Sequence, residues 1–145
     1  MSNHTDYRRI TPEDVFIDLP LEEWQKVDDF KYLIETRPTG IEFLDVFFEV
    51  IKRHKKIQAI QIAKIMQVNE LTLRHTVLAL TGIFVHDWVT QYVFLVCCKL
   101  LKYTDYSIIE VAKRAGFTSA SAFTQFFMRM QKLSPIDWRS AHRVR

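Results

Sequence analysis

The feature that most constrains the fold of this 145-residue chain is an outline that occurs twice. In each copy, two short amphipathic segments are separated by a turn of a few residues. The first copy spans about residues 58–82, and the second spans about residues 107–131. Apolar residues in both copies recur at the period of a helix that buries one face. The chain is therefore predicted to contain two helix-turn-helix units, which is an internal duplication of structure.

The first copy carries its own start and stop signals. A helix is predicted from about Ala59 to Met66, followed by a short turn at residues 67–69. Asn69 is a favoured N-cap for the next helix, since its side-chain oxygen can accept hydrogen bonds from free backbone N–H groups. Gly82 can adopt the left-handed conformation that commonly ends a helix. The second helix of this unit is therefore expected to end just before Gly82.

The second copy has equivalent signals. Ser107 and Glu110 form a predicted capping box, and Gly116 suits the positive φ that a tight corner between two helices favours. Either Thr118 or Ser119 is expected to cap the helix that follows. Three phenylalanines on that helix are expected to face the core: Phe123, Phe126 and Phe127.

A long apolar helix is predicted between the two copies, from about residue 86 to residue 103. Its segment 92–98 is apolar on every face, which a helix lying on a single surface would not need. We therefore expect this helix to be buried between two lobes. With only 3 Gly and 4 Pro in the chain, many strand reversals are disfavoured. The predicted fold class is all-α, with two helix-turn-helix lobes joined by a linker helix and a short N-terminal helical extension.

Residues 1–38 are predicted to form an acidic extension ahead of a basic body, residues 39–145. Residues 1–40 hold 5 Lys/Arg against 9 Asp/Glu, a net charge of −4, whereas residues 41–145 hold 15 against 8, a net charge of +7. Thr39 and Glu42 form a predicted capping box for the first helix of the body. Apolar residues in the extension recur at helical spacing and predict one amphipathic helix there, packed on the body. These residues are Leu21, Trp24, Val27, Phe30, Leu33 and Ile34.

Several classes of function are disfavoured by what the sequence lacks. The five histidines show no metal-ligand spacing, so we expect no metal and no cofactor. No catalytic motif is present, which argues against an enzyme. The adjacent Cys97 and Cys98 are poorly placed for an intrachain disulfide, which favours a reducing cytoplasm. The N-terminus does not resemble a signal peptide, and the apolar stretch 83–98 is too short to span a bilayer, so no membrane partner is expected.

The second unit resembles the signature of the AraC/XylS family of transcription regulators. The resemblance rests on residues 107–123, which include Gly116-Phe117, together with Phe126-Phe127 and residues 134–139, Ser-Pro-Ile-Asp-Trp-Arg. The first unit, from Ile62-Ala63 to Thr81-Gly82, fits the weaker signature of the family's first helix-turn-helix. Roughly residues 41–142 are covered.

The resemblance implies seven helices in two lobes, each presenting a recognition helix to successive major-groove segments of double-stranded DNA. It implies transcription control as the biological role, with RNA polymerase or another regulator as further partners, and a monomer or weak homodimer. Carried over by position, the base-facing residues are Leu71, Arg74 and His75 in the first unit and Ala120, Ser121, Thr124 and Gln125 in the second. The implied candidates for phosphate contact or support are Lys113, Arg114 and Arg139.

The chain also departs from the family pattern. Residues that are usually cationic in the family are here Gln125, Met128, Leu78, Ala79 and Val93, and a usual Gly is Lys132. Fewer cations release fewer counterions, which predicts weaker binding at physiological salt. Two hypotheses follow. The chain is either a sequence-specific DNA-binding regulator or an AraC-like module with reduced DNA affinity that acts on another protein.

Overall fold

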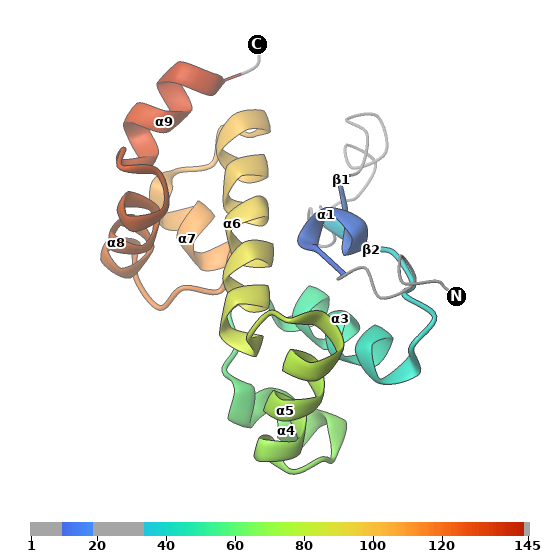
Figure 1. Ribbon diagram of the computed structural model, residues 1–145. Helices are drawn as coiled ribbons and strands as arrows, with labels where there is room; N and C mark the ends of the chain where they lie inside the picture. The colour runs from blue at the N-terminus through green and yellow to red at the C-terminus, as the bar shows by residue number, and fades with distance from the viewer. Residues whose placement is uncertain (1–9, 19–33, 144–145) are drawn as a thin grey trace.

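A computed structural model describes residues 10–18 and 34–143. Figure 1 shows a long central helix, α6, with one group of helices on each side of it. The elements, in chain order, are α1 (Pro12–Val15), β1 (Phe16–Asp18), β2 (Ile34–Thr36), α3 (Glu42–His54), α4 (Ala59–Met66), α5 (Glu70–Thr81), α6 (Val85–Tyr103), α7 (Ile108–Arg114), α8 (Ala120–Gln131) and α9 (Pro135–His142). We call α3–α5 the first lobe and α7–α9 the second lobe.

The predicted N-caps form in both lobes. Asn69 Oδ1 accepts from the backbone N–H of Leu71 at 2.8 Å and opens α5. Ser107 and Ser119 accept from N–H groups three residues later at 3.1 and 3.0 Å and open α7 and α8. Ser134 does the same for α9, which carries a Pro in its first turn. These caps satisfy N–H groups that lack a partner inside the helix, so they fix where each helix starts.

The predicted capping box at Thr39 and Glu42 is wrong. The helix begins at Glu42 with Ile41 as its N-cap, so Thr39 lies too far ahead to cap the first turn. Instead, the backbone N–H and hydroxyl of Thr39 both donate to Asp45 Oδ1, at 2.7 and 2.8 Å. Gly40, at φ 86°, makes the turn between Thr39 and the helix. Thr39 therefore anchors the chain to the side of α3 rather than starting it.

A two-stranded hairpin completes the core of the first lobe. β1 and β2 are antiparallel, with Phe16 opposite Thr36. The ring of Phe16 is 8% exposed and lies 5.7 Å from Trp88 and 5.2 Å from Tyr92, both in α6. The same ring contacts Phe48 of α3 at 6.1 Å. Residues ahead of the body therefore supply apolar surface to α3 and α6.

The prediction of a helix in the N-terminal extension is wrong for its last residue, Ile34. Ile34, the last member of the apolar stripe, lies in strand β2, where its carbonyl accepts a hydrogen bond of 3.1 Å from the Tyr92 hydroxyl. This long-range bond and the pairing with β1 hold the backbone extended, so tertiary contacts outweigh the local helical spacing. The rest of the stripe, residues 21–33, lies outside the described residues.

The linker helix α6 is buried as predicted. Tyr92, Val93, Val96 and Cys97 are each at most 1% exposed. Phe94, on the side of the second lobe, lies 5.7 Å from Phe127 of α8. The all-round apolar character of residues 92–98 is thus explained, because one side of α6 packs on the first lobe and the other side on the second. Burial raises the pKa of the Cys97 thiol well above its ordinary value.

The two lobes also touch directly at one point away from α6. Gly116, in the corner between α7 and α8, has a φ of 97°. A Cβ added to Gly116 would lie 3.1 Å from the backbone nitrogen of Lys56 and 3.2 Å from its Cβ. The Lys56 ammonium lies 5.4 Å from the centre of the Phe117 ring. We call this approach of Gly116 and Phe117 to Lys56 the interlobe seat, since it places the corner of the second lobe against the end of α3.

Candidate nucleic-acid interface

The three residues predicted to face bases in the first lobe share one exposed side of α5. The opposite side packs into the core through Leu73, Val77 and Thr81, each fully buried. Leu71 is 60% exposed, and Arg74 and His75 are exposed as well. Residues three and four apart lie next to each other on a helix. The structure therefore brings Leu71, Arg74 and His75 together on one surface, available to a partner.

Arg74 is held by an acidic residue one turn earlier on the same helix. Its Nε donates to Glu70 Oε2 at 2.8 Å, and its Nη2 lies 2.8 Å from the same oxygen. The two side chains are 51% and 36% exposed, so the pair lies at the protein surface. Sequence reasoning missed Glu70, although an acid four residues ahead of an arginine on a predicted helix is a signal for such a pair.

The corresponding surface of α8 carries no charge at the predicted positions. Ser121 and Gln125 are exposed, whereas Ala120 and Thr124 are partly buried. Met128, one turn further along, is 42% exposed. The four predicted positions can offer hydroxyl and amide hydrogen bonds and apolar contact but no charge, and the exposed Arg129, one turn beyond Gln125, is the cation of α8.

The aromatic residues of the second lobe belong to its core. The Phe117 ring lies 5.5 Å from Phe123 and 5.2 Å from Phe126. Phe127 contacts Trp138 of α9 at 5.7 Å in an edge arrangement. Because these rings pack on one another inside the lobe, they hold α8 in place and are not open for stacking on bases.

The three candidate phosphate-binding cations lie in different environments. Lys113 is exposed on α7. Arg114 donates from Nε to Glu110 at 2.9 Å, and its guanidinium carbon lies 4.3 Å above the Tyr106 ring.

Arg139 joins α9 to the end of the linker helix. Its Nε donates to the carbonyl of Leu101 at 3.0 Å. Its Nη2 is buried with no hydrogen-bond partner among the described residues, and burial lowers the pKa of Arg139. This geometry gives Arg139 a role in holding α9 against α6, so of the three cations Lys113 is the one most open to a phosphate.

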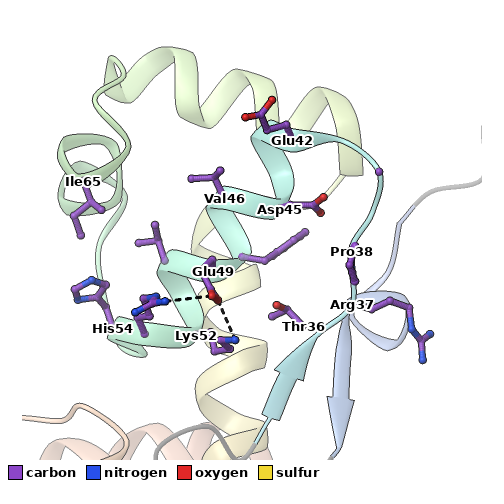
Figure 2. Close-up of a pocket in the computed structure, with 14 residues that line it drawn as sticks. Thr36, Arg37, Pro38, Glu42, Asp45, Val46, Glu49, Lys52, His54 and Ile65 are labelled. Carbon is purple, nitrogen blue, oxygen red and sulfur yellow. Dashed lines mark ion pairs between the residues drawn. The ribbon is translucent and has the colours of Figure 1, made fainter.

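A surface pocket of about 780 Å³ lies along α3 and the connection from β2. Glu49 pairs with Lys52 at 3.0 Å and with Arg53 at 3.6 Å, and Figure 2 shows Glu49 and Lys52 on the same helix. Burial opposes the charge on Lys52, but hydrogen bonds to Glu35 and Glu49 outweigh it and raise the pKa of Lys52. None of the residues predicted to contact DNA lines this pocket. Lys52 and Arg53 already face carboxylates, which makes the pocket a poor site for a phosphate.

Within residues 10–18 and 34–143, no group of three or more His, Cys, Asp or Glu side chains could hold a metal ion. Within the same ranges, no single helix combines the length and the apolar character needed to cross a membrane.

The structure places two helix-turn-helix units on one long buried helix, and the second helix of each unit has an exposed side. This arrangement defines the class of protein: a two-lobed helix-turn-helix DNA-binding domain. A family model described as a helix-turn-helix domain matches residues 62–141. Since this match covers more than half of the chain, the protein belongs to that family, and its relatives are of AraC type. The predicted resemblance and all-α fold class are confirmed, with the short hairpin as an addition.

The chain is similar to the HTH-type transcriptional activator RhaR of Enterobacter sp. (strain 638), with 33% identity over 79 residues. The match covers 54% of this chain but only 27% of RhaR, so it spans little more than a quarter of that protein.

Two solved structures are similar in fold. The C-terminal domain of AraT, a response regulator from Geobacillus stearothermophilus, has a TM-score of 0.65 at 19% identity and covers 71% of this chain and 87% of that one. The DNA-binding domain of AdpA, a global transcriptional factor solved in complex with a target DNA, has a TM-score of 0.61 at 28% identity and covers 68% and 90%.

Proposed function

We propose that this chain binds double-stranded DNA sequence-specifically and regulates transcription, with α5 and α8 entering successive segments of the major groove. The observation that carries the proposal is the exposed surface of α5, where Leu71, Arg74 and His75 stand together opposite a fully buried side. The major groove admits one helix per lobe and displays base edges that such side chains can read. The AdpA domain, which shares 28% identity with this chain, was solved on its target DNA, and this supports the proposal.

The two recognition helices would read bases by different chemistry. In the first lobe, Arg74 can donate two hydrogen bonds to a guanine, Leu71 can contact a thymine methyl, and His75 can reach a base or a phosphate. In the second lobe, Gln125 can pair with an adenine, while the hydroxyls of Ser121 and Thr124 can donate to bases or phosphates. Ala120 is small enough to let the helix approach a thymine methyl.

Affinity would come from few phosphate contacts. Lys113 is exposed, whereas Arg114 and Arg139 already have partners within the protein. We therefore expect the affinity to depend less steeply on salt than for a domain with a cationic second recognition helix.

A monomer would cover both groove segments, with at most a weak homodimer, and the effect on transcription would need RNA polymerase or another regulator. Cys97 and Cys98 are not joined in a disulfide, which suits a cytoplasmic location.

The lack of charge at the predicted base-facing positions of α8 favours a second candidate function: an AraC-like module that has lost much of its DNA affinity and contacts a protein instead. Residues 92–98 give this alternative no support, because they bury most of their apolar surface between the lobes rather than offering it to a partner. DNA binding is therefore the better supported of the two functions.

Selection of randomised duplex DNA by the purified chain, sequenced at two salt concentrations, tests the proposal. Enrichment of a bipartite motif with half-sites about one helical turn apart is the expected result. A variant with Arg74→Ala should lose part of the motif. Val46→Ala, which changes an exposed residue beside the α3 pocket, should leave the motif intact. Absence of any binding at low salt would contradict the proposal and support the protein-interaction alternative.

A further inference from the structure

The ion pair at the start of α5 fixes the direction of the Arg74 guanidinium. Both Nε and Nη2 of Arg74 lie 2.8 Å from a single oxygen, Oε2 of Glu70. Two donors on one edge of a planar group, both directed at one acceptor, restrict its rotation. The residue that fixes this plane is the first residue of the recognition helix, one turn from Arg74.

The pair leaves the rest of the guanidinium available. A guanidinium has five N–H donors arranged in a rigid fork, and the contact with Glu70 uses the edge formed by Nε and Nη2. The other edge, formed by Nη1 and the second hydrogen of Nη2, has no partner among the described residues. Two parallel donors at that spacing match the O6 and N7 acceptors of a guanine in the major groove.

A second pair in the molecule has the same spacing but a different setting. On α7, Arg114 Nε lies 2.9 Å from Glu110 Oε2. There, the guanidinium carbon lies 4.3 Å from the centre of the Tyr106 ring, so one flat surface of the group is covered by protein. The α7 pair therefore serves packing, whereas the α5 pair holds an arginine that is 51% exposed beside Leu71 and His75.

We propose that Glu70 is a specificity-determining positioning residue: it holds Arg74 by the Nε edge so that the opposite edge reads one guanine. The inference rests on the proposed function and deepens it. Glu70 itself brings a negative charge close to the phosphates, which lowers non-specific affinity. Glu70 would therefore increase the discrimination between base pairs and lower the overall affinity for DNA.

These two effects have opposite signs, and this makes the proposal testable. Glu70→Ala should reduce the preference for guanine at one position of the selected motif by about fivefold or more, the lower end for one bidentate contact. The same variant should bind an unrelated duplex more tightly at low salt, because a repulsive charge is gone. Glu70→Gln keeps an acceptor oxygen at the same reach and should retain part of the preference while showing the same gain in non-specific binding.

Two controls separate this role from a structural one. Glu110→Ala breaks the matched pair on α7 and should leave the base preference unchanged. Arg74→Lys keeps the positive charge but cannot make the two parallel bonds, so it should lose the guanine preference even with Glu70 present. Thermal melting followed by circular dichroism should show all variants folded, since exposed pairs of this spacing contribute little to stability.

The outcomes also separate this inference from the proposed function. If the wild-type chain selects a bipartite motif and Glu70→Ala leaves every position unchanged, the role of Glu70 is wrong and DNA recognition stands. If the wild-type chain selects no motif, both are wrong. Loss of preference at one position in Glu70→Ala, with the other positions intact, supports both.

Discussion

The two lobes adopt left-handed backbone conformations at equivalent positions but use different residues there. Each lobe has a left-handed residue at the corner between its helices and another where its recognition helix ends. In the first lobe these are Gln67, at φ 58°, and Gly82, at φ 75°. In the second lobe they are Gly116, at φ 97°, and Lys132, at φ 60°. The glycine stands at the helix end in one lobe and at the corner in the other.

The difference shows when glycine is required rather than merely favoured. Gln67 and Lys132 are exposed and adopt the left-handed conformation at a cost of about 1 kcal/mol each. Gly116 differs because it lies against Lys56, where an added methyl group would be held 3.1 Å from a backbone nitrogen, closer than ordinary contact distance. A positive φ alone is met by other residues in this chain, whereas a positive φ combined with so close an approach favours glycine more strongly.

The lobes also differ in what supports them and in what they present. The first lobe takes Phe16 and Ile34 from outside the repeat into its core, and its recognition helix carries Arg74. The second lobe has its own aromatic cluster and a recognition surface without charge at the predicted positions. Four predictions test this comparison, from the largest effect to the smallest.

Phe16→Ala should lower the free energy of unfolding by about 3 to 5 kcal/mol, because it removes a buried ring in contact with Phe48, Trp88 and Tyr92. Urea unfolding followed by circular dichroism measures this. Phe84→Ala, which truncates a ring that is 61% exposed, is the matched control and should change stability by less than about 0.5 kcal/mol. Equal effects of the two substitutions would show that the hairpin is not part of the first lobe's core.

Gly116→Ala should cost about 3 kcal/mol, since backbone strain and the collision with Lys56 add. Gly40→Ala has a similar φ of 86° but meets nothing within 4 Å, and should cost only about 1 kcal/mol of strain. The difference between the two variants in urea unfolding measures the interlobe seat itself. A difference near zero would mean that the lobes separate easily at this point.

Gln125→Arg should make the second lobe more like the first by adding a cation to α8. On the proposed function, the plot of log affinity against log salt should become steeper by about 0.9 for one added phosphate contact. Binding measured by fluorescence anisotropy at several salt concentrations gives this slope. Val46→Arg adds the same charge beside the α3 pocket, and a slope that steepens equally there would mean that only net charge matters.

Gln67→Gly should stabilise the chain by a few tenths of a kcal/mol. Relief of left-handed strain is largely offset by the greater freedom of glycine in the unfolded chain. Lys132→Gly should behave alike, because it occupies an equivalent conformation in the other lobe. Thermal melting of both variants gives the comparison, and a loss of more than about 1 kcal/mol in either would show that its side chain has a role not evident from its exposure.

Local signals in the sequence predicted most of the helical part of the fold. Asn69 and Ser107 cap helices where expected, and of the two candidates Thr118 and Ser119 it is Ser119 that caps α8, because an N-cap acts within three residues of itself. The exposed side of α5 was also predictable, since it follows from helical spacing. The Glu70–Arg74 pair was visible in the sequence at the spacing of one turn, but its importance depends on which side of α5 is exposed.

What escaped prediction depends on contacts between distant residues. Ile34 fits a helical stripe by spacing, yet pairing with β1 and the hydroxyl of Tyr92 hold it in a strand. The approach of Gly116 to Lys56 joins residues 60 positions apart, and no local pattern marks it. The positive φ of Gly116 could be predicted, whereas its close approach to Lys56 could not.

The interlobe seat has a mechanical consequence for any duplex that both recognition helices grip. The two lobes are connected both through α6 and through the contact of Gly116 with Lys56. We therefore expect the distance and angle between α5 and α8 to change little. One inserted base pair turns the second half-site by about 34° around the duplex axis, and two helices held at a fixed angle would not follow this rotation. On the proposed function, the duplex would then have to bend or twist instead, so base-pair steps that deform easily would be favoured between the half-sites.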